Sequence, residues 1–528
     1  MTSNWLLISP FVKGGLRGIY KVSLFVEWGL RGIYKVSPFV KGGLRGIYKV
    51  SLFVKGGLRG ILLFLLLFNS TGLNAQIGSF GVSDARSMGM GNTFNSNTKD
   101  VYSSGKNPAL LIPSDTSETL LKFMLPGISS DVYTNSIPPD EVEYFFGGPE
   151  SRDLTEGEKD RLYGYFAEGN GKYNYYASFT PLAIVYKPSG KIGAFGFTMS
   201  DFVSGGFTIP SSLAQLALKG NEAGKTYSLD DLRFQTWWLR SYSLSYSKEV
   251  LNNREGFIKN INAGISIKYI SGFAYTGIEK VSSSFQTGEK NVLNGNYYVE
   301  AYSSFSDDLA VRYDYDTVTH VYDLNYFSTP AGSGLGLDIG FSAELDSGIT
   351  VGLAITDIGS INWSSNVAKH ISQKQLYIDD LFNKEQLDSV TDIGSSESKP
   401  VADYMTTLPT CLRFGISVLA SDYLDGLPGS LLLALDYNQG LNNKPSNSTT
   451  PRFSLGTEWQ PFDIGLSILT GLSHDETYRF NWSLGLGYSS SLIEAYLSTL
   501  DIISTLSPNN TKPHASFAFN LTWKVMGN

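Results

Sequence analysis

The sequence predicts an all-β fold, a transmembrane antiparallel β-barrel of about 14 strands. Three observations predict it. Apolar and polar residues alternate in many short segments, charged residues make up only 17% of the 528 residues, and aromatic residues reach 13%. The charged fraction is below the roughly 25% of an average soluble domain. Alternation with a period of two places apolar side chains on one face of a strand, and that face must lie against a core or against lipid.

The clearest hairpin is predicted over residues 334–358, with a turn at Asp346-Ser347-Gly348. On both strands every second residue is apolar: Leu335, Leu337, Ile339, Phe341, Ala343 and Leu345, then Ile349, Val351, Leu353 and Ile355. The residues between them are small or polar. This pattern is typical of a strand with one apolar face.

Other strands are expected along the whole chain after the N-terminal region, about 14 to 16 in all. They are predicted at residues 120–127, 176–187, 191–204, 235–249, 260–275, 296–305, 411–421, 430–438, 450–459, 463–473, 479–489, 492–499 and 514–525. No later segment offers about 20 continuous apolar residues, so no transmembrane helix is predicted. A sheet in lipid has to close, because an open edge would leave backbone groups unpaired.

The connections between the predicted strands are unequal in length. Residues 187–190 and 460–463 are tight turns, whereas residues 128–172, 205–232 and 360–410 are long and polar. Short turns at one end and long loops at the other are typical of outer-membrane barrels. Helices are predicted at residues 211–219 and 366–389. These two helices are expected either to pack within their loops or to form a ligand gate or lumenal constriction.

The N-terminus consists of two different segments. Residues 11–60 repeat with a period of 14, so residues 1–53 are interpreted as a repetitive extension from a start assigned too far upstream, or else as a basic membrane-binding segment. Residues 54–75 carry Lys55 and Arg59, the apolar run 61–68 and Ala75, which predicts a secretory signal peptide. Beyond residue 75 the chain holds 31 basic and 48 acidic residues, which argues against nucleic acid as a partner.

The sequence holds few residues that could carry out catalysis or bind a metal. One cysteine, Cys411, excludes a disulfide framework within the chain. The four histidines lie far apart and are interpreted as surface or loop residues: His320, His370, His474 and His514. We therefore predict no catalytic residue, no metal site, no cofactor and no enzyme activity.

The segment before the first strand carries a motif. It reads Ala85-Arg86-Ser87-Met88-Gly89-Met90-Gly91, followed by Asn107-Pro108-Ala109. It resembles the N-terminal signature of the long-chain fatty-acid transporter (FadL/TodX) superfamily, and PorV-like barrels of the type IX secretion system begin similarly. The later layout also resembles outer-membrane barrels defined only as a domain of unknown function.

This resemblance implies a 14-stranded barrel, residues 113–528, with residues 76–112 folded back inside as an N-terminal hatch. The hatch motif residues would be Gly89, Gly91, Asn107, Pro108 and Ala109. The polar residues expected to face the lumen are Asp338, Glu344, Arg413 and Glu458. The structural alternative is a pair of soluble β-sandwiches, whose strands alternate in the same way.

The predicted function is passive uptake or binding of a small hydrophobic molecule by a monomeric barrel in the outer membrane of a Gram-negative cell, in contact with outer-membrane lipid. The alternative is a non-transporting barrel that acts as a secretion-system or surface-protein adaptor through its long loops. A third reading, a lipolytic enzyme, needs a serine and a histidine close in space.

Overall fold

The computed structural model describes residues 84–112, 120–146, 154–167, 169–188, 191–253, 255–288, 292–309, 311–314, 317–320, 328–346, 348–378, 397–424, 426–474, 480–506 and 514–526. The repetitive extension, the signal peptide and residues 76–83 of the predicted hatch lie outside this part of the chain. Their assignments stay predictions.

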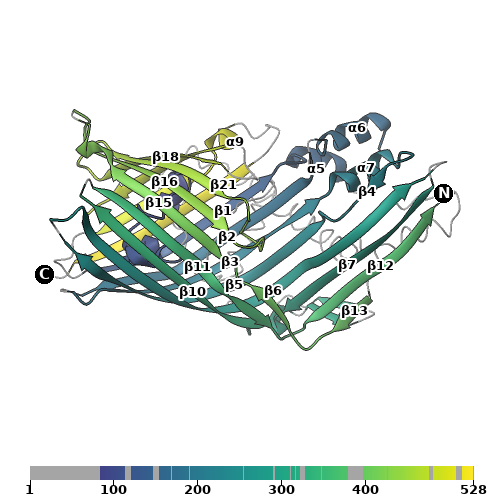
Figure 1. Ribbon diagram of the computed structural model, residues 1–528, viewed down its shortest axis with the longest axis horizontal. Helices are drawn as coiled ribbons and strands as arrows, with labels where there is room; N and C mark the ends of the chain where they lie inside the picture. Colours follow the sequence, from purple (N-terminus) through teal and green to yellow (C-terminus); the bar gives the residue numbers. More distant parts are fainter. Residues whose placement is uncertain are drawn as a thin grey trace, which may run out of the picture.

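Fourteen strands form a closed antiparallel barrel (Figure 1). Each strand pairs with the next one around the ring, and β21 pairs with β1, with Leu120 opposite Met526. In ring order the strands are β1 (Leu120–Thr134), β2 (Gly171–Lys187), β3 (Ala194–Ile209), β5 (Arg233–Asn252), β6 (Ile258–Thr287), β10 (Gly332–Leu345), β11 (Ile349–Trp363), β15 (Cys411–Leu419), β16 (Ser430–Gly440), β17 (Arg452–Gln460), β18 (Leu466–His474), β19 (Asn481–Ser489), β20 (Ile493–Thr499) and β21 (His514–Met526). The predicted fold class is confirmed.

The barrel wall is apolar outside and polar or small inside. In β19, Trp482, Leu484 and Leu486 are exposed on the outer face, whereas Asn481 and Ser483 are buried inside. The hairpin of β10 and β11 shows the same alternation, with Leu335 and Leu353 exposed. A closed barrel with an apolar outer face satisfies its backbone groups internally and presents lipid-compatible side chains, as a membrane barrel must.

The two ends of the barrel differ. Short turns join β2 to β3, β5 to β6, β10 to β11, β17 to β18 and β19 to β20, and the short helix η8 (Ala420–Asp422) lies between β15 and β16. The connections at the other end hold the helices α5 (Pro139–Phe146), α6 (Glu156–Gly164), α7 (Ser211–Lys219) and α9 (Ile502–Leu506). The helix expected at residues 211–219 is confirmed. Among the described residues, no helix is long and apolar enough to cross a membrane.

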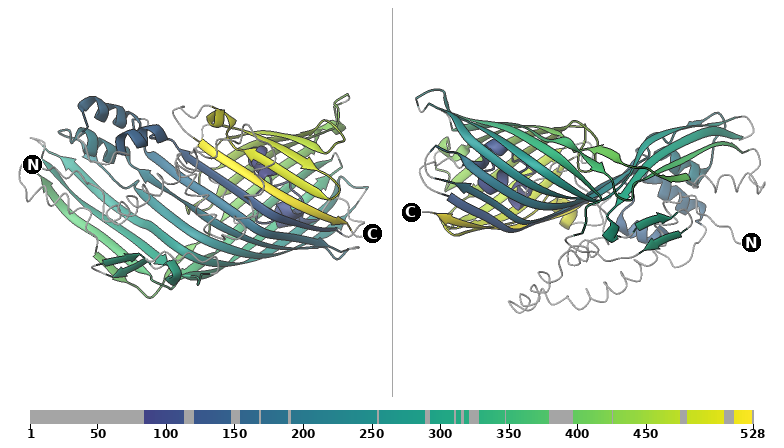
Figure 2. Two further views of the ribbon diagram at one scale, coloured as in Figure 1. Left: turned by 180° about the vertical axis from the view of Figure 1, so that it is seen from behind. Right: turned by 90° about the horizontal axis from the view of Figure 1, so that it is seen from below.

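A second sheet extends from the long-loop end of the barrel. Strand β6 is 30 residues long. Its first part pairs with β10, and residues 274–287 pair with β7 (Leu293–Phe305) instead. Strand β7 pairs with β12 (Ala368–Ile378), which pairs with β13 (Glu397–Pro400). We call residues 274–287, β7, β12 and β13 the wing; Figures 1 and 2 show it projecting well beyond the barrel.

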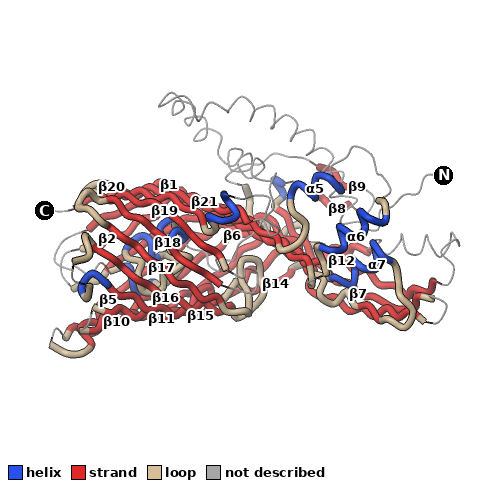
Figure 3. The backbone as a smooth tube through the Cα atoms, turned by 90° about the horizontal axis from the view of Figure 1, so that it is seen from above, coloured by secondary structure: helices blue, strands red, loops and turns tan. Residues whose placement is uncertain are grey.

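Smaller elements surround the wing. Strand β4 (Thr226–Tyr227) pairs with the end of β6, and β14 (Tyr404–Thr407) pairs with the end of β11. The hairpin of β8 (Val311–Asp314) and β9 (Thr317–His320) follows the short helix η6 (Asp307–Leu309). Figure 3 shows α5, α6 and α7 grouped beside the wing strands. They share a small apolar core that includes Phe145, Leu162 and Ala214.

The helix predicted at residues 366–389 is wrong where the structure describes it. Residues 368–378 form β12, and residues 379–389 lie outside the described part of the chain. The apolar spacing in this segment fits a helix, but β7 offers a free strand edge, and backbone pairing along it outweighs the local pattern. The strand predicted at residues 296–305 exists as part of β7, in the wing and not in the barrel.

Residues 84–112 lie inside the barrel, and we call them the plug. They contain the short helices α4 (Ala85–Gly89), η3 (Asp100–Ser103) and η4 (Pro108–Leu111), seen within the barrel in the right panel of Figure 2. Almost every plug residue is buried, including its polar ones. Residues 84–112 therefore lie in the lumen, and the assignment of residues 76–112 as a hatch stays a prediction.

Candidate functional site: the plugged lumen

Local sequence signals shape the plug. The Asp84 carboxylate caps α4 by accepting a hydrogen bond from the backbone N–H of Arg86 at 2.9 Å. After α4 the chain reverses through Gly91 and Asn92, with φ angles of 68° and 60°, values that glycine and asparagine adopt most readily. The side chain of Asn107 caps η4, and Pro108 occupies its first turn.

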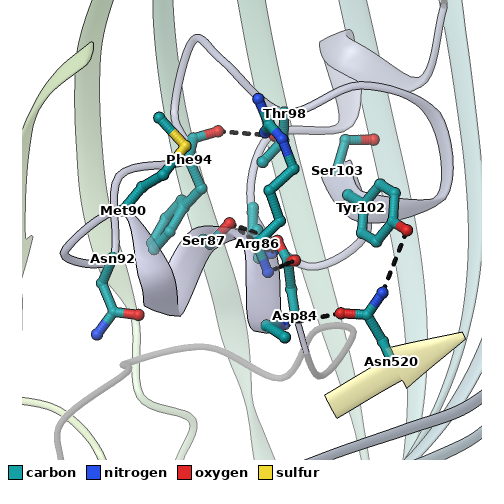
Figure 4. A network of polar contacts seen from close by, with 12 residues as sticks. Asp84, Arg86, Ser87, Met90, Asn92, Phe94, Thr98, Tyr102, Ser103 and Asn520 are labelled. Carbon is teal, nitrogen blue, oxygen red and sulfur yellow. Dashed lines mark hydrogen bonds and ion pairs between the residues drawn. The ribbon is translucent and has the colours of Figure 1, made fainter. Parts of the chain in front are cut away.

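Buried charges hold the plug to itself and to the wall. Arg86 donates to the Glu458 carboxylate of β17 through Nε at 2.9 Å and through Nη2 at 2.5 Å. Within the plug, Lys106 pairs with Asp84 at 2.5 Å. Figure 4 shows Asp84 beside Ser87 and Arg86, and Asn520 hydrogen-bonded to Tyr102. Because an unpaired buried charge is strongly destabilising, these pairs set one position for the plug in the lumen.

Hydrogen bonds fix the plug to further strands. The Asp436 carboxylate of β16 accepts the backbone N–H groups of Phe94 at 2.6 Å and Asn95 at 2.9 Å. On the other side, the backbone N–H of Ala85 donates to Asn520 of β21 at 2.9 Å. The plug is thus anchored to separate parts of the barrel wall.

The wall facing the plug is lined with glycine. A Cβ added at any of seven lumenal glycines would come against the plug, in most cases against its backbone: Gly264, Gly340, Gly352, Gly415, Gly456, Gly471 and Gly485. We call these residues the glycine belt. Only glycine lets two backbones approach this closely. The plug and the wall are therefore fitted to each other.

A second charged cluster lies in the lumen on β6, β10 and β11. The Lys268 ammonium contacts Asp357 at 2.5 Å and Asp338 at 2.9 Å, and all three side chains are fully buried. Asp357 has a φ of 57° at a register shift between β10 and β11, which is a β-bulge. The bulge turns Asp357 into the lumen next to Thr356, and Arg413 donates to the Thr356 hydroxyl at 3.1 Å.

The predicted hatch motif residues lie together in the plug. Gly89 and Gly91 contact β18, and Pro108 and Ala109 lie against Gly264. Asn107 is fully buried, and its side-chain amide donates to the Asn95 carbonyl at 3.1 Å and to the Phe341 carbonyl of β10 at 3.2 Å.

The four predicted lumenal polar residues do not form one group. Asp338 and Arg413 belong to neighbouring parts of the β10–β15 wall, and Glu458 pairs with the plug. Glu344 lies on β10 near the short turn to β11 and accepts a hydrogen bond from Asn260 at 2.7 Å, away from the others.

Several residues of this site were missed by sequence reasoning. Arg86 belongs to the N-terminal motif but has no role predicted from it. The sequence around Asp84, Lys106 and Lys268 gives no signal of a buried charge. The position of Asp357 in the sequence could have indicated a bulge. Strict alternation after Ile355 would place the Asp357 charge on the lipid face, and a bulge avoids this by turning the side chain inward. Asp436 alternates with apolar Leu435, which marks it as facing the lumen.

The interpretation of the histidines as surface or loop residues is wrong for His370 and His514. His514 on β21 contacts Asp131 at 2.7 Å and is buried. His370 on β12 lies 2.9 Å from the Ser303 hydroxyl and 2.7 Å from the Ser398 hydroxyl. A hydrolase would need a carboxylate in place of Ser398 to orient the ring and a reachable serine, and Ser303 is fully buried. In the described residues no group of three or more acidic, histidine or cysteine side chains is placed to bind a metal.

The barrel wall is interrupted beside the plug. In the ladder between β1 and β2, the pairs between Met124–Ala183 and Gly127–Thr180 are missing, at Pro126 and Pro181, while the register stays the same. At this level the register does shift between β1 and β21 and between β2 and β3. Proline has no N–H to donate to a ladder. Directly inside lies an apolar cluster from wall and plug that includes Met124, Ala183, Val101, Tyr102 and Leu111.

Comparison with known proteins gives a family and several similar structures. The model of a family described as "Family of unknown function (DUF5723)" matches residues 108–500. No curated protein matches the chain. Among solved structures, the toluene transporter TbuX of Ralstonia pickettii is 13% identical, with a TM-score of 0.38 over 85% of this chain and 98% of that one.

Two further solved structures have similar values. A FadL homologue of Pseudomonas aeruginosa is 12% identical, with a TM-score of 0.38 over 84% of this chain and 98% of that one. The toluene transporter TodX of P. putida is 10% identical, with a TM-score of 0.38 over 85% of this chain and 98% of that one.

Proposed function

The chain belongs to the family of unknown function DUF5723, and we propose that it is an outer-membrane barrel that takes up a small hydrophobic molecule by a passive route beside its plug. The outer membrane is the bilayer in which bacterial barrels with short turns at one end and long loops at the other reside. The apolar outer face described above supports a position in lipid.

The observation that carries the proposal is the apolar cluster behind the wall interruption. The lumen around the plug holds paired charges, glycines and one continuous apolar cluster, which extends to Leu469 and Tyr496. Between β1, β2 and the plug, Met124, Val101 and Leu111 belong to this cluster. The strands that cover it lack ladder pairs at Pro126 and Pro181. A small movement there, of the wall or of the plug, opens a path lined by apolar side chains.

Two engineered disulfides test this path. Ser104 of the plug and Thr198 of β3 have hydroxyl oxygens 2.7 Å apart, so a cysteine pair there ties the plug to the wall. Ser129 of β1 and Ser178 of β2, 2.9 Å apart, tie the interrupted strands together. Each pair is introduced with Cys411→Ala, and uptake of the fluorescent hydrophobic probe 1-N-phenylnaphthylamine into proteoliposomes is measured before and after reduction.

We expect oxidation of at least one of these pairs to slow uptake, and reduction to restore it. The matched control is a cysteine pair at Ser245 and Ser266, which join β5 and β6 away from the interruption at 2.7 Å and leave uptake unchanged. Uptake that is no faster than in protein-free vesicles, or that is unaffected by both test disulfides, would show that the proposal is wrong.

A second role is favoured by one observation. The wing is a large ordered extension outside the barrel, which ring closure does not require. It supports the adaptor alternative, in which surface elements at the long-loop end bind a partner while the barrel serves as the anchor. The two roles are compatible, because they use different parts of the molecule.

A further inference from the structure

The two faces of the wing differ in chemistry. One face is apolar and covered: Phe285, Tyr297 and Leu376 are buried together with Tyr227. The other face consists of the even-numbered residues 280–286 and 294–302 and the odd-numbered residues 369–377, which are cross-strand neighbours. We call it the polar wing face. All its residues are exposed or partly exposed.

The composition of the polar wing face is unlike that of the barrel wall. Half of its residues are serine, asparagine or glutamine, and the others are three tyrosines, two lysines, one glutamate and Ile371. Lipid contact is excluded, because these polar groups would lose their hydrogen bonds to water. The centre of a protein interface is enriched in Tyr, Trp, Phe, Met and Arg and depleted of Lys, Glu and Ser. This face has tyrosine but none of the other four enriched types, and it holds all three depleted types.

Its aromatic rings are held in place before any ligand arrives. The Glu300 carboxylate accepts hydrogen bonds from the Tyr302 hydroxyl at 2.9 Å and from the Tyr298 hydroxyl, and it pairs with Lys369 at 3.1 Å. Lys280 lies over the Tyr298 ring at 5.3 Å. Although partial burial opposes it, hydrogen bonds from Tyr298, Lys369 and Tyr302 lower the pKa of Glu300, which keeps it ionised. Side chains ordered in advance lose less entropy on binding.

The spacing of the rings suits an extended ligand. Tyr377 is 54% exposed and lies opposite Asn294, so Tyr298 and Tyr377 are four residues, or about 13 Å, apart along neighbouring strands. The Tyr302 ring is stacked on Tyr404 with ring centroids 3.9 Å apart, so it supports the face and is not a stacking surface for a ligand. Amide side chains at Asn296, Gln373 and Gln375 lie between the rings and can both donate and accept hydrogen bonds.

We propose that the polar wing face binds a glycan chain. A sugar ring has C–H groups on its faces, which stack on tyrosine, and hydroxyl groups around its rim, which pair with amides and hydroxyls. Rings spaced along one chain would stack on the separate tyrosines, with the amides between them. Two lysines against one glutamate make this face positive in a chain with a formal net charge of −8, and Lys399 and Glu397 at its β13 edge balance each other, so sugars that carry carboxylates are favoured over neutral ones.

The test is retention of the whole protein, in detergent micelles, on immobilised polygalacturonate and on immobilised dextran. We expect retention on the acidic polymer, and weaker retention on the neutral one. Tyr298→Ala and Tyr377→Ala should each weaken binding roughly tenfold. Tyr298→Phe keeps the ring and should retain most of it. The matched control is Tyr423→Ala, a tyrosine 57% exposed near the short turns.

Folding of each variant is checked by the heat-dependent shift in gel mobility that closed barrels show. Failure of the wild-type protein to bind either polymer, or equal binding by Tyr298→Ala, overturns the proposal. So does retention from an outer-membrane extract that protease abolishes and periodate leaves intact, because it would identify a protein ligand. None of these outcomes affects the uptake assay, which does not involve the wing.

Discussion

At the scale of single residues, buried charges that are shielded from water position the plug. The side chains of Arg86 and Glu458 are 11% and 7% exposed. Removal of one member leaves the other buried and unpaired, which costs about 3–5 kcal/mol, whereas replacement of both by apolar groups is often neutral. The pair therefore sets where the plug sits more than it stabilises the barrel.

We expect Arg86→Ala to loosen the plug by about 3–5 kcal/mol while the barrel stays closed. Hydrogen–deuterium exchange measured by mass spectrometry should then be faster in residues 84–112 and unchanged in the barrel strands. Adding Glu458→Leu to Arg86→Ala should restore part of the protection. The control is Glu156→Ala, because the Glu156–Lys159 pair is exposed. Unchanged exchange in Arg86→Ala would contradict the anchoring role.

At the scale of elements, plug and wall meet through backbone. A methyl group at Gly471 on β18 would collide with the backbone of Met90 and Gly91. Neither partner can yield easily, since one belongs to a hydrogen-bonded strand and the other to a tight turn. The fit of the plug therefore depends on the absence of side chains in the glycine belt.

Gly471→Ala should displace the plug at a cost of about 1–3 kcal/mol from overpacking. The measurement is maleimide labelling of Ser87→Cys in a Cys411→Ala background, since Ser87 is 2% exposed in the native arrangement. Labelling should be faster with Gly471→Ala. Gly164→Ala, where a methyl group would enter open space on α6, should have no effect. Equal labelling in the two glycine variants would show that the belt tolerates side chains.

At the scale of the whole molecule, barrel and wing are separable by topology. Gly272 faces Gly332 across β6 and β10, and Trp363 faces Tyr404 across β11 and β14. The chain between each pair leaves the barrel, builds the wing and returns. Stacked rings of Trp363, Tyr275 and Tyr404 join the two parts. Ring closure itself uses pairs outside these excursions, apart from four pairs of β5 with residues 274–277.

We therefore expect a variant in which short Gly/Asn turns replace residues 273–331 and 364–403 to fold as a closed barrel. It should show the heat-dependent mobility shift and uptake of the hydrophobic probe, with a lower unfolding temperature because the aromatic stack is lost. Retention on polygalacturonate should disappear. Loss of the closed barrel itself would mean that the wing is needed to form it.

The sequence alone determined the features that depend on local pattern. Alternation placed Leu335 and Trp482 outside and Asn481 inside, because successive side chains of a strand point to opposite faces. Turn residues separated short from long connections. These inferences need only residues close together in the chain.

Only the tertiary structure decided what depends on distant partners. A helix is expected from the sequence over residues 366–389, yet residues 368–378 form a strand on the free edge of β7. His514 is buried because Asp131, far away in sequence, lies across the β1–β21 seam. The pairing of Arg86 with Glu458, the inward turn of Asp357 and the face of the wing that carries Tyr298 all follow from strand register. Within a hairpin the apolar pattern and the turn set the register, but strands far apart in sequence, such as β1 with β21 and β7 with β12, pair only in the complete fold.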